Sequence, residues 1–208
     1  MKLTARQEQL LRHTFIDYRA TSEFLENPLV IEKAKGLYYW DTAGKRYFDA
    51  IGGIFVAILG HGHPRVMEAM RRQMERVTFV PPLHGIADVT LDFVEKVGAV
   101  APGNLKYVKP FSGGSEAVEA AMKFVRQFYK QSGHPGKYKF VSRYFGYHGA
   151  TFGGMAASGT GVRKSKFEPQ LGGVLKVFPP NHYRDCFPTW DEANRFAARP
   201  LRAERLRA

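Results

Sequence analysis

The sequence contains a single cysteine, Cys186, which excludes an internal disulfide and a metal site built from paired cysteines. It lacks any run of the roughly eighteen apolar residues that a membrane-spanning helix requires. Residues 1–11 show neither the basic segment nor the apolar run of a secretory signal. We therefore expect a soluble protein of the reducing cytoplasm without a membrane partner.

Several signatures of known chemistry are also missing. There is no Gly-x-x-x-x-Gly-Lys-Ser/Thr loop and no Gly-x-Gly-x-x-Gly fingerprint, which disfavours a nucleoside triphosphate or a dinucleotide as ligand. No Gly-x-Ser-x-Gly elbow supports a serine hydrolase. We expect no metal site, because the candidate histidines have no carboxylate or cysteine at a supporting spacing. These histidines are His61, His63, His84 and His134.

The residues that are present have the composition of a globular protein, with 208 residues, 44% hydrophobic and 13% aromatic. A formal net charge of +12 raises nucleic-acid binding as an alternative, because clustered Lys and Arg neutralise phosphates. Most basic residues are spread along the chain, and only short groups and the segment after Arg199 concentrate them. We expect no nucleic-acid partner, since a basic balance alone bears on solubility and non-specific association.

The pattern of apolar residues predicts an α/β fold. Strands and helices alternate from residue 107 onward, which favours a largely parallel sheet. Upstream, a polar turn over 41–45 between two apolar strands indicates a β-hairpin. The expected elements are hairpin strands at 36–40 and 46–50, helices at 64–77, 86–97 and 116–131, a glycine-rich loop and short helix within 143–158, strands at 107–111, 137–142 and 174–178, and a helical stretch at 191–199.

A Ser/Gly-rich loop precedes the helix expected at 116–131. A strand that delivers such a loop to a helix N-terminus can hold a phosphate, because the first turn leaves backbone N–H groups unpaired. Gly113 and Gly114 permit a close approach and Ser115 adds a hydroxyl. A tight turn with a serine N-cap is the alternative. Glu116 and Glu119 are expected in the first turn, where they complement the helix dipole.

A second glycine-bounded segment places Tyr147 and His148 between Gly146 and Gly149. An aromatic ring at such a position can stack on a flat cofactor, which contributes about 1 kcal/mol beyond the burial of its area. Tyr147 as a core residue and His148 as an ordinary hydrogen-bonded histidine are the alternative. Local sequence alone does not separate the two interpretations.

Taken together, these segments resemble the class III aminotransferases over about residues 20–196, in the same order as in that family. The resemblance implies the N-terminal half of a fold-type-I transferase that depends on pyridoxal 5'-phosphate. It implies that Gly114 and Ser115 hold the cofactor phosphate, and that Tyr147 stacks on the pyridine ring with His148 beside it. The segments that carry the resemblance are Gly36–Asp41, Lys45–Asp49, Gly60–Pro64, Phe111–Ala121 and Tyr147–Gly153.

The same resemblance sets the expected domain organisation. Residues 1–60 correspond to an N-terminal segment with the β-hairpin of the small domain. Residues 61–198 correspond to the first half of the large cofactor-binding domain. Residues 199–208 are interpreted as a basic tail or an out-of-frame segment, because they use few residue types and follow a helical stretch that Pro200 interrupts.

Two departures from the family pattern bear on function. Ala150 stands where members that act on α-amino acids have an arginine, which favours ω-amino acids or simple amines as donors and a keto acid as acceptor, with Phe55 in the substrate pocket. The Ser-Lys-Gly-like loop and the Asp-Glu-Val-like strand, which carry the Schiff-base lysine and the pyridinium carboxylate, do not occur in these 208 residues. We interpret the lysines that are present as solvated surface charges.

The missing lysine leads to an expectation for the chain on its own. Without that lysine we expect no turnover. We also expect low stability, because a half-built sheet leaves an edge unpaired and an apolar face uncovered. The family resemblance implies a homodimer. A non-catalytic subunit that pairs with a full-length transaminase is the alternative function.

Overall fold

The computed structural model describes residues 3–17 and 19–179. The chain forms two compact units, Met1–Tyr107 and Val108–Ala208, and each is described by itself. The helical stretch expected at 191–199 and the basic tail at 199–208 lie outside the described residues. None of the helices in the described part is long and apolar enough to cross a membrane. The domain bounds at residues 60 and 198 stay a prediction.

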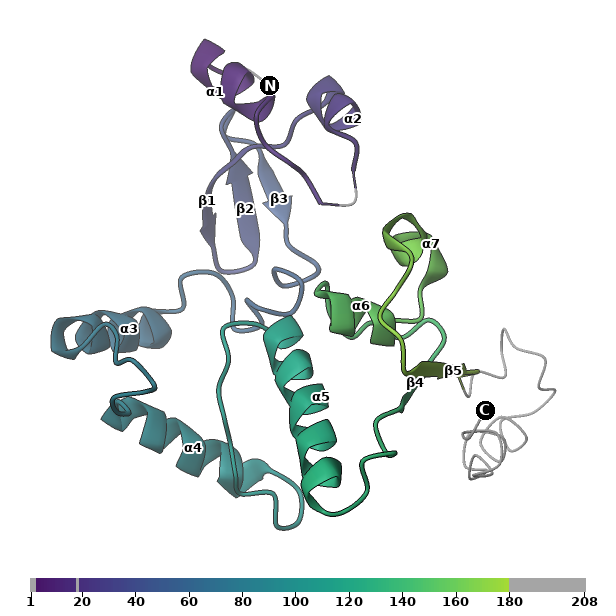
Figure 1. The fold of residues 1–208 in the computed structure, drawn as a ribbon. Coiled ribbons are helices and arrows are strands. Elements are labelled where there is room, and N and C mark those ends of the chain that lie inside the picture. The colour runs from purple at the N-terminus through teal and green to yellow at the C-terminus, as the bar shows by residue number, and fades with distance from the viewer. Residues whose placement is uncertain (1–2, 18, 180–208) are drawn as a thin grey trace, which may run out of the picture. The chain divides into compact units, whose positions relative to one another are not determined.

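The first unit contains a three-stranded antiparallel sheet (Figure 1). Helices α1 (Ala5–Leu11) and α2 (Thr21–Glu26) precede it, and its strands are β1 (Ile31–Lys35), β2 (Tyr38–Asp41) and β3 (Arg46–Phe48). The predicted hairpin is confirmed, because β2 pairs with β3 through Tyr38–Phe48, Tyr39–Tyr47 and Trp40–Arg46. Strand β1, which pairs with β2, was not predicted as a separate strand, since its sequence carries two lysines and a glutamate.

Asp41 explains the tight turn between β2 and β3. Its side chain is buried, and Oδ1 accepts hydrogen bonds from the N–H groups of Ala43 and Lys45, each at 2.9 Å. Oδ2 accepts a hydrogen bond from the Tyr47 hydroxyl, also at 2.9 Å. A carboxylate that binds the backbone just ahead of it stabilises a turn. Asp41, the first residue of the predicted turn, therefore also stabilises the turn through its side chain.

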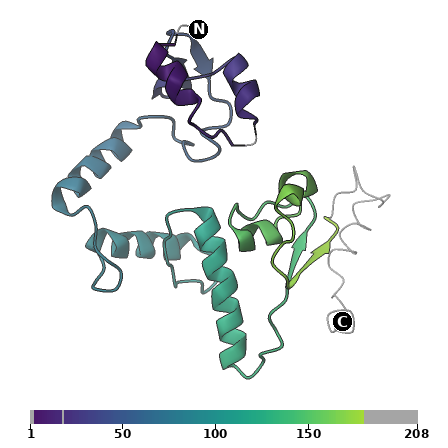
Figure 2. The same cartoon turned by 45° about the horizontal axis from the view of Figure 1, so that its top comes forward.

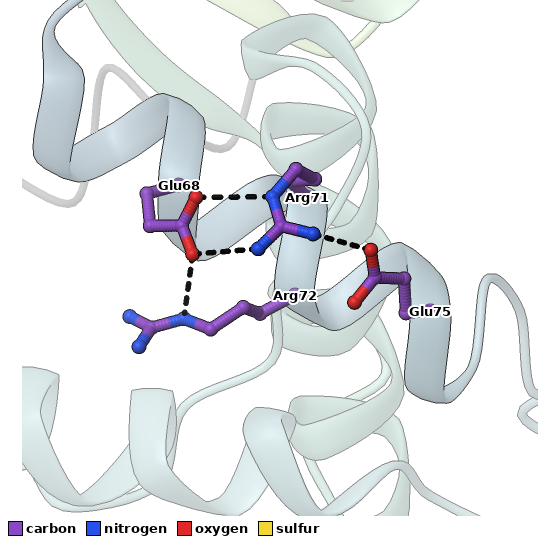
Figure 3. Close-up of polar contacts among 4 residues, drawn as sticks. All are labelled: Glu68, Arg71, Arg72 and Glu75. Atoms are coloured by element: carbon purple, nitrogen blue, oxygen red, sulfur yellow. Dashed lines mark hydrogen bonds and ion pairs between the residues drawn. The ribbon is translucent and has the colours of Figure 1, made fainter.

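Two helices follow in the first unit. Helix α3 (Pro64–Arg76) confirms the predicted helix and begins at the expected proline. Its exposed face carries ion pairs in which Glu68 binds the Arg71 guanidinium through both oxygens, at 3.0 and 2.8 Å, while Arg71 also contacts Glu75 (Figure 3). Helix α4 (Asp88–Val100) begins two residues later than predicted and ends three residues later.

The second unit is organised around a long helix, α5 (Gly114–Gln131), which confirms the predicted helix and begins two residues earlier. Glu119 therefore lies in its second turn, and the expectation that it belongs to the first turn is wrong. The strand expected at 107–111 is also wrong, because these residues form no strand. Pro110 removes a backbone donor there, and no described strand pairs with the segment.

A short parallel sheet completes the second unit. Strands β4 (Phe140–Arg143) and β5 (Val174–Val177) pair in parallel, as predicted, and helix α6 (Phe152–Ala157) lies close to them in both cartoon views (Figures 1 and 2). Helix α7 (Gly161–Lys164) and the 3-10 helix η1 (Ser165–Phe167) connect α6 to β5. This is part of a mixed α/β fold, in agreement with the predicted class.

Lys176 corrects the interpretation of every lysine as a solvated surface charge. Its ammonium donates hydrogen bonds to Ser142 Oγ at 2.7 Å, to the Ala156 carbonyl at 2.9 Å, and to the Ala157 carbonyl. Partial burial, with a smaller contribution from nearby Lys164, lowers the pKa of Lys176 to about 8. The side chain links β5 to β4 and to the last turn of α6.

Few apolar side chains are buried in the described residues. Phe24, Ala156 and Ala157 are the hydrophobic residues in that class. Large side chains on α5 such as Phe124 and Phe128 are 68% and 53% exposed. The expectation of an uncovered apolar face is therefore confirmed for the described residues, whereas the expected low stability stays a prediction.

Candidate cofactor site

The N-terminus of α5 presents backbone donors. Gly113 is the N-cap residue, and the first hydrogen bond of the helix runs from the Ala117 N–H to the Gly113 carbonyl at 3.1 Å. The N–H groups of Gly114, Ser115 and Glu116 therefore have no acceptor inside the helix. A side chain added at Gly114 would meet no atom within 4 Å. The position beside Gly114 is therefore unobstructed.

Ser115 connects this helix end to the loop at 146–151. Its hydroxyl oxygen accepts a hydrogen bond from the Ala150 N–H at 3.0 Å, across 35 residues of sequence. A Cβ added at Gly149, which has a φ of 131°, would lie 2.9 Å from Ser115 Oγ. Glycine is required for so close an approach. The hydroxyl proton of Ser115 can still be donated to a second acceptor.

The expected serine N-cap is not present at this helix. No side-chain hydrogen bond caps α5, and its N-cap residue is Gly113. The alternative of a tight turn with a serine N-cap is therefore wrong. Ser115 instead bonds to a distant loop, and this long-range contact is what brings the two predicted segments together.

The loop that carries Tyr147 and His148 is closed by its own backbone. The Gly159 N–H donates to the Gly146 carbonyl at 2.8 Å, and the His148 N–H donates to Ser158 Oγ at 2.9 Å. Tyr147 is 58% exposed, so the alternative that assigned it to a core is wrong. His148 is also exposed. An exposed ring on a fixed backbone is suited to stacking on a planar ligand.

Glu119 is a contributor to this region whose contact was not predicted. Its Oε1 accepts hydrogen bonds from the Thr151 hydroxyl at 2.6 Å, the Gly153 N–H at 2.7 Å and the Gly154 N–H at 3.2 Å. The Thr151 hydrogen bond is the largest influence on this carboxyl and lowers the pKa of Glu119. Burial, the next largest influence, raises the pKa, and each of the two N–H groups lowers it by a smaller amount. In the sequence, the spacing of four residues between Ser115 and Glu119 indicates that both side chains lie on the same face of the helix, and this spacing could have predicted the contact.

The remaining predicted site residues have different surroundings. Ala150 is exposed and contributes its backbone N–H to Ser115. Phe55 belongs to the first unit, where it is 77% exposed with a φ of 69°. His61 Nε2, considered above as a metal ligand, lies 2.8 Å from Asp49 Oδ2. The described residues contain no group of three or more side chains that could hold a metal.

Comparison with known proteins identifies the family. The sequence model of the family "Aminotransferase class-III" matches residues 20–205. A probable aminotransferase of Mycobacterium tuberculosis is 34% identical over 173 residues, which cover 83% of this chain and 37% of that protein. An uncharacterized aminotransferase of Bacillus subtilis is 38% identical over 169 residues, covering 80% of this chain and 37% of that protein.

A solved structure supports the same assignment. The omega transaminase of Pseudomonas jessenii, in complex with PMP, superposes with a TM-score of 0.84 at 30% identity, over 88% of this chain and 41% of that one. The fold is thus that of the pyridoxal-phosphate-dependent transaminases, in agreement with the cofactor implied by the resemblance. The chain belongs to the class III aminotransferase family. It spans 37% of the length of these two curated relatives.

Proposed function

We propose that this chain provides the phosphate-binding and ring-stacking part of a pyridoxal 5'-phosphate site in a class III aminotransferase. One observation carries the proposal. The N-terminus of α5 and the loop at 146–151, predicted separately as cofactor-binding segments, are joined by the hydrogen bond between Ser115 and Ala150. This contact places donors for an anion and an exposed aromatic residue on adjoining segments of one unit.

The residues present fit the cofactor's chemistry. The N–H groups of Gly114 and Ser115 and the Ser115 hydroxyl are donors, and a helix N-terminus favours negative charge. Nothing fills the space beside Gly114. Glu116 opposes an anion, since its carboxylate lies 2.6 Å from the position of a Cβ on Gly113. Glu116 is exposed, so water screens this repulsion.

Each residue has a distinct role in the proposal. Gly114 and Ser115 hold the phosphate, Tyr147 stacks on the pyridine ring, and His148 lies beside the ring. When bound, pyridoxal 5'-phosphate is the electron sink that makes transfer of an amino group possible. The chain's own residues bind and orient it, and they exclude water from one face of the ring.

The proposed substrate class depends on Ala150, which lies in this loop. Ala150 offers no cation to a substrate α-carboxylate, so we propose a simple amine or an ω-amino acid as donor and a keto acid as acceptor. We propose that Phe55 lines the pocket for the donor's carbon skeleton. The omega transaminase of Pseudomonas jessenii supports this choice, because it shares the fold at 30% identity.

For the 208 residues taken alone, we propose cofactor binding without turnover. No lysine of this sequence lies in a Ser-Lys-Gly-like loop. Lys176, the lysine whose pKa is lowered to about 8, uses its ammonium to bind Ser142 and two carbonyls of α6. We further propose a homodimeric assembly and a cytoplasmic location, both as the family resemblance implies. Light scattering on the purified protein tests the assembly.

The site is tested by titrating the chain with pyridoxal 5'-phosphate and with pyridoxal, which lacks the phosphate. We expect pyridoxal to bind at least about tenfold more weakly, because it forfeits charge-assisted hydrogen bonds. Ser115→Ala should weaken binding of the phosphate form about tenfold, whereas Ser112→Ala, a change of the exposed serine in the same loop, should not. Equal affinity for the two ligands would overturn the proposal.

Borohydride reduction followed by peptide mapping tests the absence of turnover. We expect only scattered, substoichiometric adducts on exposed lysines. A stoichiometric adduct at one lysine would show that the chain supplies its own covalent anchor. In that case the proposal of binding without turnover is wrong, while the phosphate site is retained.

A further inference from the structure

We propose that Glu119 is a positioning residue that sets where the Tyr147–His148 loop lies over the N-terminus of α5, and thereby controls binding of the cofactor ring but not of the phosphate. This inference rests on the proposed function. Glu119 would touch neither part of the cofactor. Its carboxylate oxygen Oε1 already accepts hydrogen bonds from three donors, which belong to Thr151 at the end of the loop and to Gly153 and Gly154 of α6.

Helix α6 is capped by the side chain of Glu119 on α5 and not by a side chain of its own segment. Thr151 is the N-cap residue of α6, the usual position of a side chain that bonds to the first turn, yet it makes no such bond. Its hydroxyl donates to Glu119 instead, and the same oxygen of Glu119 accepts the Gly153 and Gly154 N–H groups. Glu119, which lies on another helix, thus caps α6. The start of α6 cannot move without breaking these bonds.

Two glycines make this approach possible. A Cβ on Gly153 would lie 2.5 Å from Glu119 Oε2, closer than any side chain permits. A Cβ on Gly154 would lie 2.9 Å from the His148 carbonyl and 3.0 Å from the Gly149 Cα. The backbone of α6 therefore fits between Glu119 on one side and the Tyr147–His148 loop on the other. A shift at Glu119 is passed directly to the loop.

Ser115 and Glu119 hold the loop at two points. They are four residues apart, so they lie on the same face of α5. Ser115 bonds to Ala150, and Glu119 bonds to Thr151 and the glycines just beyond it. In both cartoon views α6 lies next to α5 (Figures 1 and 2). Two attachment points on one rigid helix fix the direction of the loop, whereas one would leave it free to pivot.

The division of roles follows from where the donors are. The backbone N–H donors for the phosphate belong to the first turn of α5, and their geometry depends on that helix alone. The ring contact of Tyr147 depends on the loop, which Glu119 holds. Removing Glu119 should therefore impair ring binding selectively. A purely structural role, in which the unit loosens as a whole, would weaken both kinds of contact equally.

The test compares two ligands on the full 208-residue chain by calorimetry: inorganic phosphate and pyridoxamine 5'-phosphate, which needs no lysine. Glu119→Ala should weaken the affinity for pyridoxamine 5'-phosphate about tenfold and leave the affinity for inorganic phosphate within about twofold. Only pyridoxamine 5'-phosphate has a ring on which the loop can stack. Glu119→Gln should restore most of the affinity, since an amide oxygen also accepts hydrogen bonds. Glu116→Ala, the matched loss of a carboxylate on the same helix, should change both affinities by one factor.

A milder variant keeps the inference testable if Glu119→Ala does not fold. Thr151→Val removes one of the three donors to Glu119 and should weaken pyridoxamine 5'-phosphate about threefold without affecting phosphate. If the wild type binds pyridoxamine 5'-phosphate no more tightly than phosphate, the proposed stacking function is wrong and this inference falls with it. If the wild type prefers pyridoxamine 5'-phosphate but the variants lose both ligands equally, or neither, only the positioning role is overturned.

Discussion

Asp49 in the first unit and Glu119 in the second are both carboxylates that hold a glycine-containing turn by its backbone N–H groups. Asp49 Oδ2 accepts hydrogen bonds from the Gly53 N–H at 2.7 Å and from His61 at 2.8 Å. Its partners are four and twelve residues away. Those of Glu119 are 32 to 35 residues away. The same chemistry thus closes a local turn in one unit and joins distant segments in the other.

The two turns also differ in how they store strain. In the first, residues 52–55 all have positive φ, and two of them, Ile54 at 54° and Phe55 at 69°, are not glycine. A left-handed conformation costs a residue with a side chain roughly 1–2 kcal/mol. In the second, the close approaches fall on glycines, as at Gly149 and Gly153. Asp49 therefore holds a turn that contains strained residues, whereas Glu119 holds Thr151, Gly153 and Gly154, none of which has a positive φ.

The largest expected effect comes from breaking the tightest backbone contact of the second unit, where Gly159 packs against residues 143–145. A Cβ on Gly159 would lie 2.2 Å from the Arg143 carbonyl and 2.6 Å from the Tyr144 Cα, both backbone atoms that cannot rotate away. Gly159→Ala should destabilise the second unit by about 3 kcal/mol or more. Gly161→Ala is the matched control, because nothing lies within 4 Å of that position. Urea unfolding followed by circular dichroism measures both, and equal midpoints would contradict the loop geometry.

These contacts show which features a sequence reveals. Pro64 at a helix start and Asp41 at a turn act on their immediate neighbours, so local patterns predicted α3 and the hairpin correctly. Gly114, Ser115 and Tyr147 were predicted as cofactor-binding residues because each stands in a short motif, and these assignments stay predictions. The contact of Glu119 with Thr151 and the burial of Lys176 against Ser142 depend on partners more than thirty residues away, which no local spacing encodes. The strand predicted at 107–111 is wrong for the same reason. A strand forms only where another strand pairs with it, and the local sequence does not show whether such a partner exists.

Acid should weaken both turns, with an effect intermediate in size. Hydrogen bonds lower the pKa of both carboxyls: the bond with His61 is the largest influence on Asp49, and the bond with Thr151 is the largest on Glu119. A lowered pKa in the folded state adds stability above the unfolded pKa, and this stability is lost as pH falls through the folded value. The unfolded values are 4.5 for Glu and 3.8 for Asp. The stability that Glu119 adds should therefore begin to be lost below pH 4.5, and the stability that Asp49 adds below pH 3.8.

Amide hydrogen exchange between pH 6 and pH 3 separates these two steps. The Gly153 N–H reports on Glu119 and the Gly53 N–H on Asp49, after correction for the intrinsic pH dependence of exchange. Glu119→Gln should make protection of Gly153 insensitive to pH while leaving Gly53 unchanged. Loss of protection at both amides together with amides outside the two turns would indicate that acid unfolds the whole chain rather than the turns.

The smallest expected effect comes from relieving the strain in the first turn. Ile54→Gly removes a β-branched side chain from a left-handed position, which gains roughly 1–2 kcal/mol, against about 0.5–1 kcal/mol of added entropy in the unfolded chain. The first unit should therefore become more stable by about 0.5–1 kcal/mol. Ile58→Gly is the matched control, because Ile58 is exposed to a similar extent, 75% against 71%, and is not among the residues with positive φ. It should destabilise by about 0.5–1 kcal/mol. Opposite signs for the two variants in urea unfolding would support a strained left-handed turn held by Asp49, whereas equal losses would show that Ile54 does not adopt this conformation in solution.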